Sequence, residues 1–165
     1  MDNSDFVKFE RLSRSSGLSL GKNPVELGEK EFFSDHPFDS RNIHGEISKA
    51  CIKLFNDGHF EEAVFKAFKI IEITVREKSG CKGQGYALMM DVFDEKKPRL
   101  KFNELKSNSE IDEQRGLRNI FAGAFPAVRN PRGHDDIPDT LDQCLDHLSF
   151  ASYLMRHLDK AIRSI

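Results

Sequence analysis

Residues 43–79 read IHGEISKACIKLFNDGHFEEAVFKAFKIIEITVREKS, and this stretch decides the fold. Its apolar residues recur at the three- and four-residue spacing of one helix face, first over 43–55 and again over 63–75. Between them, Asn56-Asp57-Gly58 supplies a stop, because glycine readily takes the left-handed conformation that ends many helices. Glu61 and Glu62 suit the first turn of the second helix. The stretch therefore predicts two antiparallel helices joined by a tight turn.

The rest of the chain continues the helical pattern. We expect a small helix near 87–93, a third major helix over about 110–128, and a last helix from about 139 almost to 165, with a short strand near 100–105. Pro126 is expected to kink or tighten the end of the third helix, and Asn130-Pro131 to end it. Asp139 is the expected N-cap of the last helix.

These elements predict an all-α fold, an up-down bundle of four to five helices in which four are principal. The sequence has no strand–helix alternation, internal repeat or glycine-rich phosphate loop. The bundle is expected to span residues 39–165. Residues 1–38, which are rich in serine and glycine and broken by prolines, are expected to form an N-terminal arm or linker.

Composition narrows the class of protein. The chain has 165 residues, of which 38% are hydrophobic and 32% charged, as in a soluble globular domain. It has no apolar run of membrane-spanning length and no secretory pattern at its acidic start, so we expect no membrane association. Three scattered cysteines indicate a reducing compartment, which predicts the cytoplasm. The net charge of -2 means that any nucleic-acid binding needs a local basic patch.

Such a patch is predicted near residue 129. On a regular helix, Arg115, Arg118 and Arg129 fall within roughly 60° of each other, and Arg132 adds a cation in the following loop. The only acid between residues 113 and 134 is Glu113. We therefore expect Arg115, Arg118 and Arg132 to bind RNA or phosphate beside Arg129.

The stretch Arg129-Asn130-Pro131-Arg132-Gly133-His134 carries the candidate chemistry. Cleavage of RNA by its own 2′-hydroxyl requires proton removal and stabilisation of a phosphorane. His134 could transfer protons, and Arg129 could clamp the phosphate through paired hydrogen bonds. Asn130 could orient the phosphate or the imidazole of His134. One of the two acids at 135–136 could hold the imidazole in one tautomer. This chemistry needs no metal and no cofactor. A simpler interpretation is an arginine that meets a helix dipole and a solvated histidine.

Two other sets of polar residues invite a function. His147 and His157 lie ten positions apart without neighbouring cysteine or acidic ligands, a spacing that does not indicate zinc. Lys66, Glu72 and Arg76 fit an ion-pair ladder on the polar face of the second helix, although Glu72 could also point into a site between helices.

The chain resembles the Ymh-type bacterial domain over roughly residues 40–163. The resemblance rests on Gly58-His59-Phe60-Glu61-Glu62-Ala63-Val64 in the first half, and on Phe121-Ala122-Gly123-Ala124 and the 129–134 stretch in the second. That domain is similar to the HEPN superfamily of helical bundles, whose motif is an arginine, a polar residue and a histidine that follows the arginine after a gap of four to six residues. Arg129, Asn130 and His134 match this motif, whereas Gly133 stands where alanine is expected.

The resemblance implies a metal-independent endoribonuclease of a toxin or antiviral-defence type, including abortive infection. It also implies a homodimer with two motifs facing one cleft, and an antitoxin or defence-system partner protein. Many members of the superfamily have lost activity, so a non-catalytic module that binds nucleic acid or protein is the main alternative. A purely structural dimer is the third.

Overall fold

A computed structural model describes residues 36–134 and 138–164, all within one compact unit, Ser34–Ile165. The described chain is almost entirely helical, which confirms the predicted all-α class. The expected arm, residues 1–38, lies outside the described residues except at 36–38.

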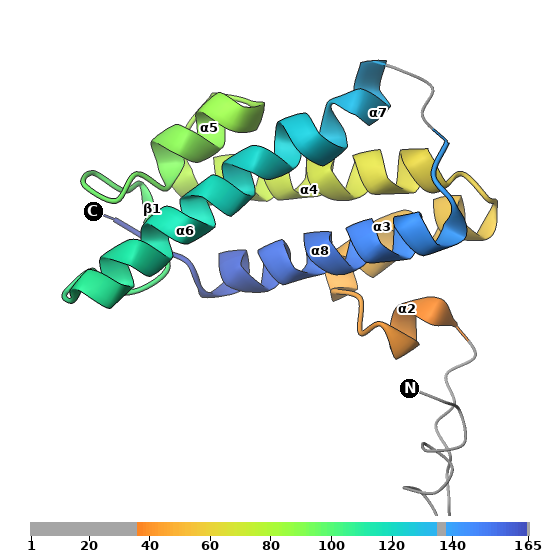
Figure 1. The fold of residues 1–165 in the computed structure, drawn as a ribbon, viewed down its shortest axis with the longest axis horizontal. Helices are drawn as coiled ribbons and strands as arrows, with labels where there is room; N and C mark the ends of the chain where they lie inside the picture. The colour runs from red at the N-terminus through yellow and green to blue at the C-terminus, as the bar shows by residue number, and fades with distance from the viewer. Residues whose placement is uncertain (1–35, 135–137, 165) are drawn as a thin grey trace, which may run out of the picture. The chain divides into compact units, whose positions relative to one another are not determined.

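Four long helices carry the unit: α3 (Gly45–Asn56), α4 (Phe60–Ser79), α6 (Asn108–Ala124) and α8 (Leu141–Lys160). Successive members of this set run in opposite directions, and α6 crosses obliquely over α4 (Figure 1). Helix α4 is central because it packs against α3 and α8 and also reaches the turn that follows α6. Its buried stripe meets apolar stripes from its neighbours in one core. The core members on α4 are Ala63, Val64, Ala67, Phe68, Ile71 and Val75.

The predicted α3–α4 pair is confirmed, including its turn. Gly58 has φ 80°, the left-handed region that favours glycine, and its backbone N–H donates to the Phe55 carbonyl. His44 begins α3 by accepting a hydrogen bond from the Glu46 backbone N–H at Nδ1. At the far end, Gly80 ends α4 in the same left-handed conformation, with φ 76°.

A short helix that was not predicted, α2 (Pro37–Ser40), precedes this pair. Proline at its first position lacks the N–H that a helix start leaves unpaired. Phe38 from α2 is 2% exposed and packs its ring 4.8 Å from that of Phe55. The core of the bundle therefore begins before residue 39, where we expected the domain to start.

The small helix expected near 87–93 is α5 (Gly85–Val92). Glu72 fixes its start, because a carboxylate oxygen of this buried residue accepts from the Gly85 backbone N–H at 2.9 Å. The other oxygen lies 3.4 Å from the Arg76 guanidinium. Glu72 thus joins α4 to α5. It keeps the expected pair with Arg76, but it is buried between helices, as in the alternative interpretation, and not on a solvated face.

The expected strand near 100–105 is present but shorter. It is β1 (Leu100–Lys101), which pairs antiparallel with β2 (Ile162–Arg163). The last helix therefore stops at Lys160, earlier than expected, and its chain turns to add this strand. The buried amide of Gln114 supports the same region by donating to the carbonyls of Phe93 and Leu100.

The start of the last helix also differs from the prediction. Thr140, not Asp139, is the N-cap of α8: its hydroxyl accepts from the Gln143 N–H, and the Gln143 side chain accepts from the Thr140 N–H. This reciprocal box satisfies two helix-end donors at once. Asp139 is not the cap; it is buried and pairs with Arg132.

Past α6 the chain widens into a π-helical turn, η1 (Phe125–Arg129), and continues as one α turn, α7 (Pro131–His134). The Asn130 N–H donates to the Phe125 carbonyl at 2.8 Å, five residues back. Pro126 has no N–H for the carbonyl four residues before it, so the ladder widens here rather than tightening. Asn130 is the C-cap of η1, which agrees with the predicted stop, but it keeps helical dihedral angles and the short helix α7 follows at Pro131.

Cys51 and Cys144 are fully buried thiols, as their apolar stripes predict. Burial raises the pKa of each thiol to about 12, so both are neutral packing groups. None of the described helices combines the length and the apolar character needed to cross a membrane.

Candidate functional site

Arg129 lies where the π-helical turn passes over α4. The guanidinium carbon sits 4.9 Å from the centre of the Phe65 ring, and Nη1 donates to the Asn130 side-chain carbonyl at 3.3 Å. The Nε atom is buried and has no hydrogen-bond partner among the described residues. Within this same part of the chain, no carboxylate pairs with Arg129. The guanidinium is therefore held in place by Phe65 and Asn130, and its charge is not offset by a described carboxylate, which suits an anion.

Phe65 and Gly133 form the base of this site. A Cβ at Gly133 would lie 2.9 Å from Cε2 of Phe65, so α7 approaches α4 at the distance that glycine permits. The same ring supports Arg129 on its face. The glycine that departs from the expected alanine is therefore matched by a bulky partner on α4, and the ring joins Gly133 to Arg129.

We expect Gly133→Ala to destabilise the protein by about 1–3 kcal/mol, because the new methyl group overpacks against Phe65. Urea unfolding of the variant measures the free-energy change. Gly116→Ala is the matched control, since a Cβ there meets nothing within 4 Å, and it should stabilise by about 0.5–1 kcal/mol. Placing Gly133→Ala in a Phe65→Leu background should remove the penalty. Equal stabilisation by both alanine variants would contradict the contact.

His134 is the last residue of α7, so the backbone of the candidate proton-transfer group follows directly from the Arg129 turn. Its side chain lies outside the described residues, as do the acids at 135–136. The predicted corner is therefore two short helical turns rather than an open loop.

Arg132 is committed to a buried ion pair. Its guanidinium donates through two nitrogens to both oxygens of Asp139, and Nη1 also donates to the Val128 carbonyl at 2.7 Å. The two side chains are 8% and 2% exposed. The pair spans residues 135–137 and ties α7 to the start of α8. Arg132 was predicted to be a cation in a loop. In the structure it lies in α7, and its ion pair holds α7 against the start of α8.

His147 from α8 completes this cluster. Its Nδ1 lies 3.4 Å from Nη2 of Arg132 and 3.9 Å from a carboxylate oxygen of Asp139. Burial, followed by the adjacent Arg132 cation, lowers the pKa of His147. The imidazole is therefore neutral near pH 7, as fits a group beside a permanent cation.

His147 and His157 are held by different neighbours: His157 packs edge-on against Tyr153 and Phe102. The described residues contain no cluster of three or more histidine, cysteine or acidic side chains that could hold a metal.

Arg115 and Arg118 lie toward the other end of α6, where they anchor the loop after α5. Arg118 donates to the Met90 carbonyl at 2.9 Å and pairs with Asp94 and Glu95. Arg115 pairs with Glu95 and Asp112. These three acids all precede residue 113, so the count of acids between residues 113 and 134 did not include them. The four arginines therefore do not form one unpaired strip, and the RNA contacts predicted for Arg115, Arg118 and Arg132 stay untested.

A sequence profile described as "Protein of unknown function (Hypoth_ymh)" matches residues 41–158, which is more than half of the chain. The chain belongs to the Hypoth_Ymh family. Comparisons with curated proteins and with solved structures give no match. The matched segment includes α3 through most of α8, and hence Arg129, Asn130 and His134.

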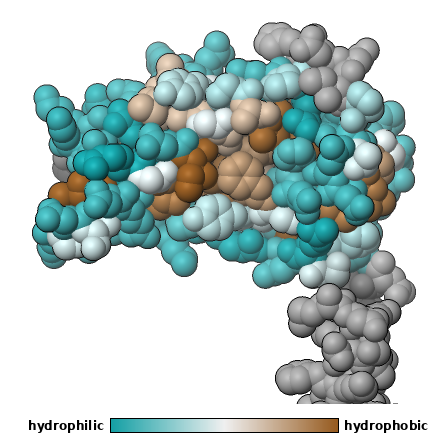
Figure 2. All heavy atoms as spheres, viewed as in Figure 1, coloured by the Kyte–Doolittle hydropathy of each residue, from teal (hydrophilic) through white to brown (hydrophobic). Residues whose placement is uncertain are grey.

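An apolar groove adjoins the site within the Hypoth_Ymh domain. It has a volume of about 480 Å³ and runs between α6, η1 and α8. Figure 2 shows apolar side chains gathered on the face where α6 and α8 lie toward the viewer. Ile120 and Tyr153 are 41% and 44% exposed there, and Val128, which precedes Arg129 in the chain, also lines the groove. Its lining residues are Asn119, Ile120, Gly123, Ala124, Ala127, Val128, Phe150 and Tyr153.

Two residues of the candidate site were not predicted from the sequence. Phe65 was not singled out, because it lies beside the apolar stripe of α4 and reads as one more core residue, whereas the structure leaves it half-buried under Arg129. Asp139 looked like a cap. Its neighbour Thr140, with Gln143 three residues later, was the sequence signal that the cap lies one position further on.

Proposed function

We propose that this protein is a metal-independent endoribonuclease with a HEPN-like site built on Arg129, Asn130 and His134. The observation that carries the proposal is Arg129: it is seated on Phe65, bonded to Asn130, unpaired with any described carboxylate, and has a buried Nε without a partner. A π-helical turn holds it, and such turns are frequent at functional sites. The arginine–polar–histidine spacing of the sequence supports the same conclusion.

In the proposed reaction, His134 takes the proton from a ribose 2′-hydroxyl, whose oxygen attacks the adjacent phosphorus. The bond from phosphorus to the 5′-oxygen breaks, and that oxygen leaves with the proton that the imidazole had taken up. Arg129 stabilises the added negative charge on the phosphorane through its fork of donors. Asn130 keeps the guanidinium oriented by accepting its Nη1–H. In this proposal Arg132 shapes the fold beside the site through its ion pair with Asp139, whereas Arg115 and Arg118 anchor the loop after α5.

Incubation of purified protein with end-labelled RNA in excess EDTA tests the proposal. Wild type should cleave the RNA, and His134→Ala should lose the activity, because the variant lacks the imidazole that takes the 2′-hydroxyl proton in this proposal. Cleavage by both proteins at the same rate, or by neither at high enzyme concentration, would contradict it. Binding of RNA that weakens with salt, without cleavage, would favour the non-catalytic alternative.

The proposed enzyme is a homodimer whose two copies meet through the apolar groove of α6 and α8. The groove exposes Ile120 and Tyr153, and an apolar patch of this kind commonly marks an interface. Because Val128 lines it next to Arg129, a second copy seated there lies beside the site of the first. We infer that the two motifs then share one cleft.

Ile120→Asp is expected to convert the dimer into a monomer and to abolish cleavage, because it places a charge in the apolar contact. Light scattering during gel filtration measures the mass at a fixed concentration. Leu141→Asp is the control: this side chain is 45% exposed at the start of α8, outside the groove, and its replacement should leave a dimer. A monomeric wild type, or a dimeric Ile120→Asp variant, would rule out this interface.

In the cell, the proposed role is that of a cytoplasmic toxin or antiviral-defence nuclease restrained by an antitoxin or another partner protein. The family resemblance supports the toxin or defence role. The partner protein is proposed because uncontrolled RNA cleavage would harm the cell that makes the enzyme.

A further inference from the structure

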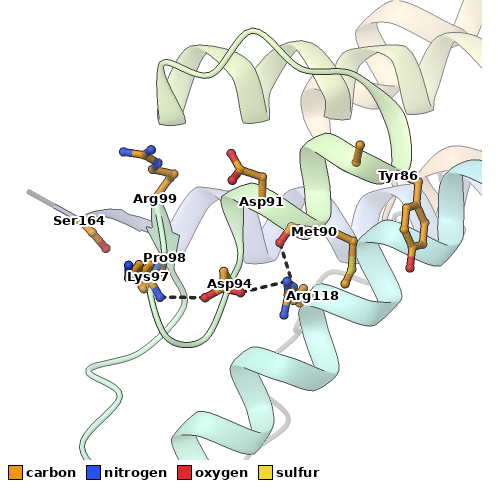
Figure 3. A pocket seen from close by; sticks show the side chains of 10 residues that line it. Tyr86, Met90, Asp91, Asp94, Lys97, Pro98, Arg99, Arg118 and Ser164 are labelled. Carbon is orange, nitrogen blue, oxygen red and sulfur yellow. Dashed lines mark hydrogen bonds and ion pairs between the residues drawn. The ribbon is translucent and has the colours of Figure 1, made fainter.

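A second cleft lies away from the Arg129 site, between α5, the loop that follows it and the end of the chain. Its volume is about 880 Å³ (Figure 3). Helix α5 supplies Tyr86, Ala87, Met90 and Asp91, the loop supplies residues 94 and 97–99, α6 supplies Arg118, and Ser164 lies at the chain's far end. The proposed ribonuclease reaction uses none of these groups.

In the middle of the cleft, hydrogen bonds hold the loop in place and an ion pair offsets the charges of its members. Arg118 binds the Met90 carbonyl and the Asp94 carboxylate, as the dashed lines in Figure 3 show. Asp94 also accepts from the backbone N–H groups of Lys96 and Lys97 at 2.9 and 2.8 Å. These bonds, led by the one from Lys97, lower the pKa of Asp94. The loop is therefore fixed, and Arg118 and Asp94 offset each other's charge.

One end of the cleft is aromatic and apolar. Tyr86 is 52% exposed, and Ala87 and Met90 line the same helix face beside it. An exposed aromatic ring in a cleft is a stacking platform for a planar ring such as a nucleobase.

The other end carries unpaired cations. Lys97 and Arg99 line it, and the described residues contain no carboxylate that pairs with either side chain. The Arg99 backbone is fixed on both sides, since its N–H donates to the Val92 carbonyl at 2.8 Å and its carbonyl accepts from the Ser164 N–H at 2.9 Å. The Ser164 hydroxyl is buried there without a partner. Two exposed cations, carried two residues apart on this backbone, suit a phosphate group.

We propose that this cleft binds a nucleoside phosphate, with its base on Tyr86 and its phosphate at Arg99 and Lys97. Figure 3 places Tyr86 at one end and Arg99 with Ser164 at the other. Because Arg99 is bonded to Val92, six residues along α5 from Tyr86, the two ends are about 9 Å apart along the helix. Asp91 lies between them as an acceptor for ribose or base hydrogens. This proposal does not depend on cleavage at Arg129.

Calorimetric titration of the full chain with AMP tests the site, with adenosine and ribose 5-phosphate as the separated halves. We expect saturable AMP binding and at least about 10-fold weaker binding of either half. Arg99→Ala and Tyr86→Ala should each weaken AMP binding about 10-fold. Lys96→Ala is the matched control, because Lys96 is an exposed cation of the same loop that does not line the cleft. Its variant should bind AMP within about 2-fold of wild type.

A further arm uses a 5′-phosphorylated RNA tetranucleotide with His134→Ala protein, which keeps the RNA intact. Tighter binding of the RNA than of AMP, lost in Arg99→Ala, identifies the ligand as the terminal nucleotide of an RNA; tighter binding of AMP identifies a free nucleotide. No saturable AMP binding at about 10 mM overturns the proposal, whatever the RNA does. Equal weakening by Arg99→Ala and Lys96→Ala also overturns it, since the effect would then be general charge. A thermal melt of each variant confirms that it is folded.

Discussion

Arg129→Ala is expected to lower the rate of RNA cleavage by about 100- to 1,000-fold, the usual effect of removing one preorganised donor from a developing oxyanion. The reason is positional: this guanidinium rests on Phe65 and Asn130 and has no described carboxylate to neutralise it. Single-turnover cleavage of a labelled RNA measures the rate. Arg129→Lys should recover only part of it, because an ammonium keeps the charge but loses the planar fork.

The control for this variant is Arg41→Ala, which removes an exposed arginine that pairs with Asp146. It should leave cleavage within about 2-fold of wild type, because its charge is largely screened by solvent. The unfolding midpoint of Arg129→Ala should stay close to that of wild type. Cleavage at the wild-type rate by Arg129→Ala would remove this residue from the site.

Arg132→Ala is expected to destabilise the fold by about 3–5 kcal/mol, since it leaves the buried Asp139 carboxylate without its partner. The contact is two-pronged, both side chains are almost fully buried, and the pair fastens α7 to α8. Urea unfolding followed by circular dichroism measures the loss. Asp139→Ala should be similarly damaging.

The double variant Arg132→Met/Asp139→Leu should recover most of this loss, because apolar side chains of similar volume commonly replace a buried ion pair without penalty. Arg41→Ala again provides the comparison, since an exposed ion pair contributes about 0.2–1 kcal/mol. A double variant as unstable as Arg132→Ala, or a single variant no worse than Arg41→Ala, would show that the pair does not clamp the fold.

The main helices could be predicted because their signals are local. The apolar stripes of 43–79, the glycine at 58 and the acids at the start of α4 each act within one or two turns, and the structure contains the helices they predict. The end of α8 depends on a distant partner instead. Ile162 continues the helical stripe, yet it joins β2 because Leu100 and Lys101 offer a strand edge that the sequence of 139–165 does not contain.

The candidate site shows the same division. The spacing of Arg129, Asn130 and His134 is visible in the chain, whereas the ion pairs that Arg115 and Arg118 make with Glu95 join residues far apart in sequence. Glu95 is 23 residues from Arg118, and no periodicity argument places it there. Pro126 gives the third example: a proline in a helix predicts a disturbance, but its form as a π-helical turn depends on how η1 packs on α4 and α5.

The most direct measurement of the central claim is the chemistry of the RNA ends, read by mass spectrometry after incubation in excess EDTA. Attack by the 2′-hydroxyl predicts 2′,3′-cyclic phosphate and 5′-hydroxyl ends from wild type, and intact RNA with His134→Ala. Fragments that carry 3′-hydroxyl and 5′-phosphate ends, or cyclic phosphate ends that persist in His134→Ala, would contradict the account.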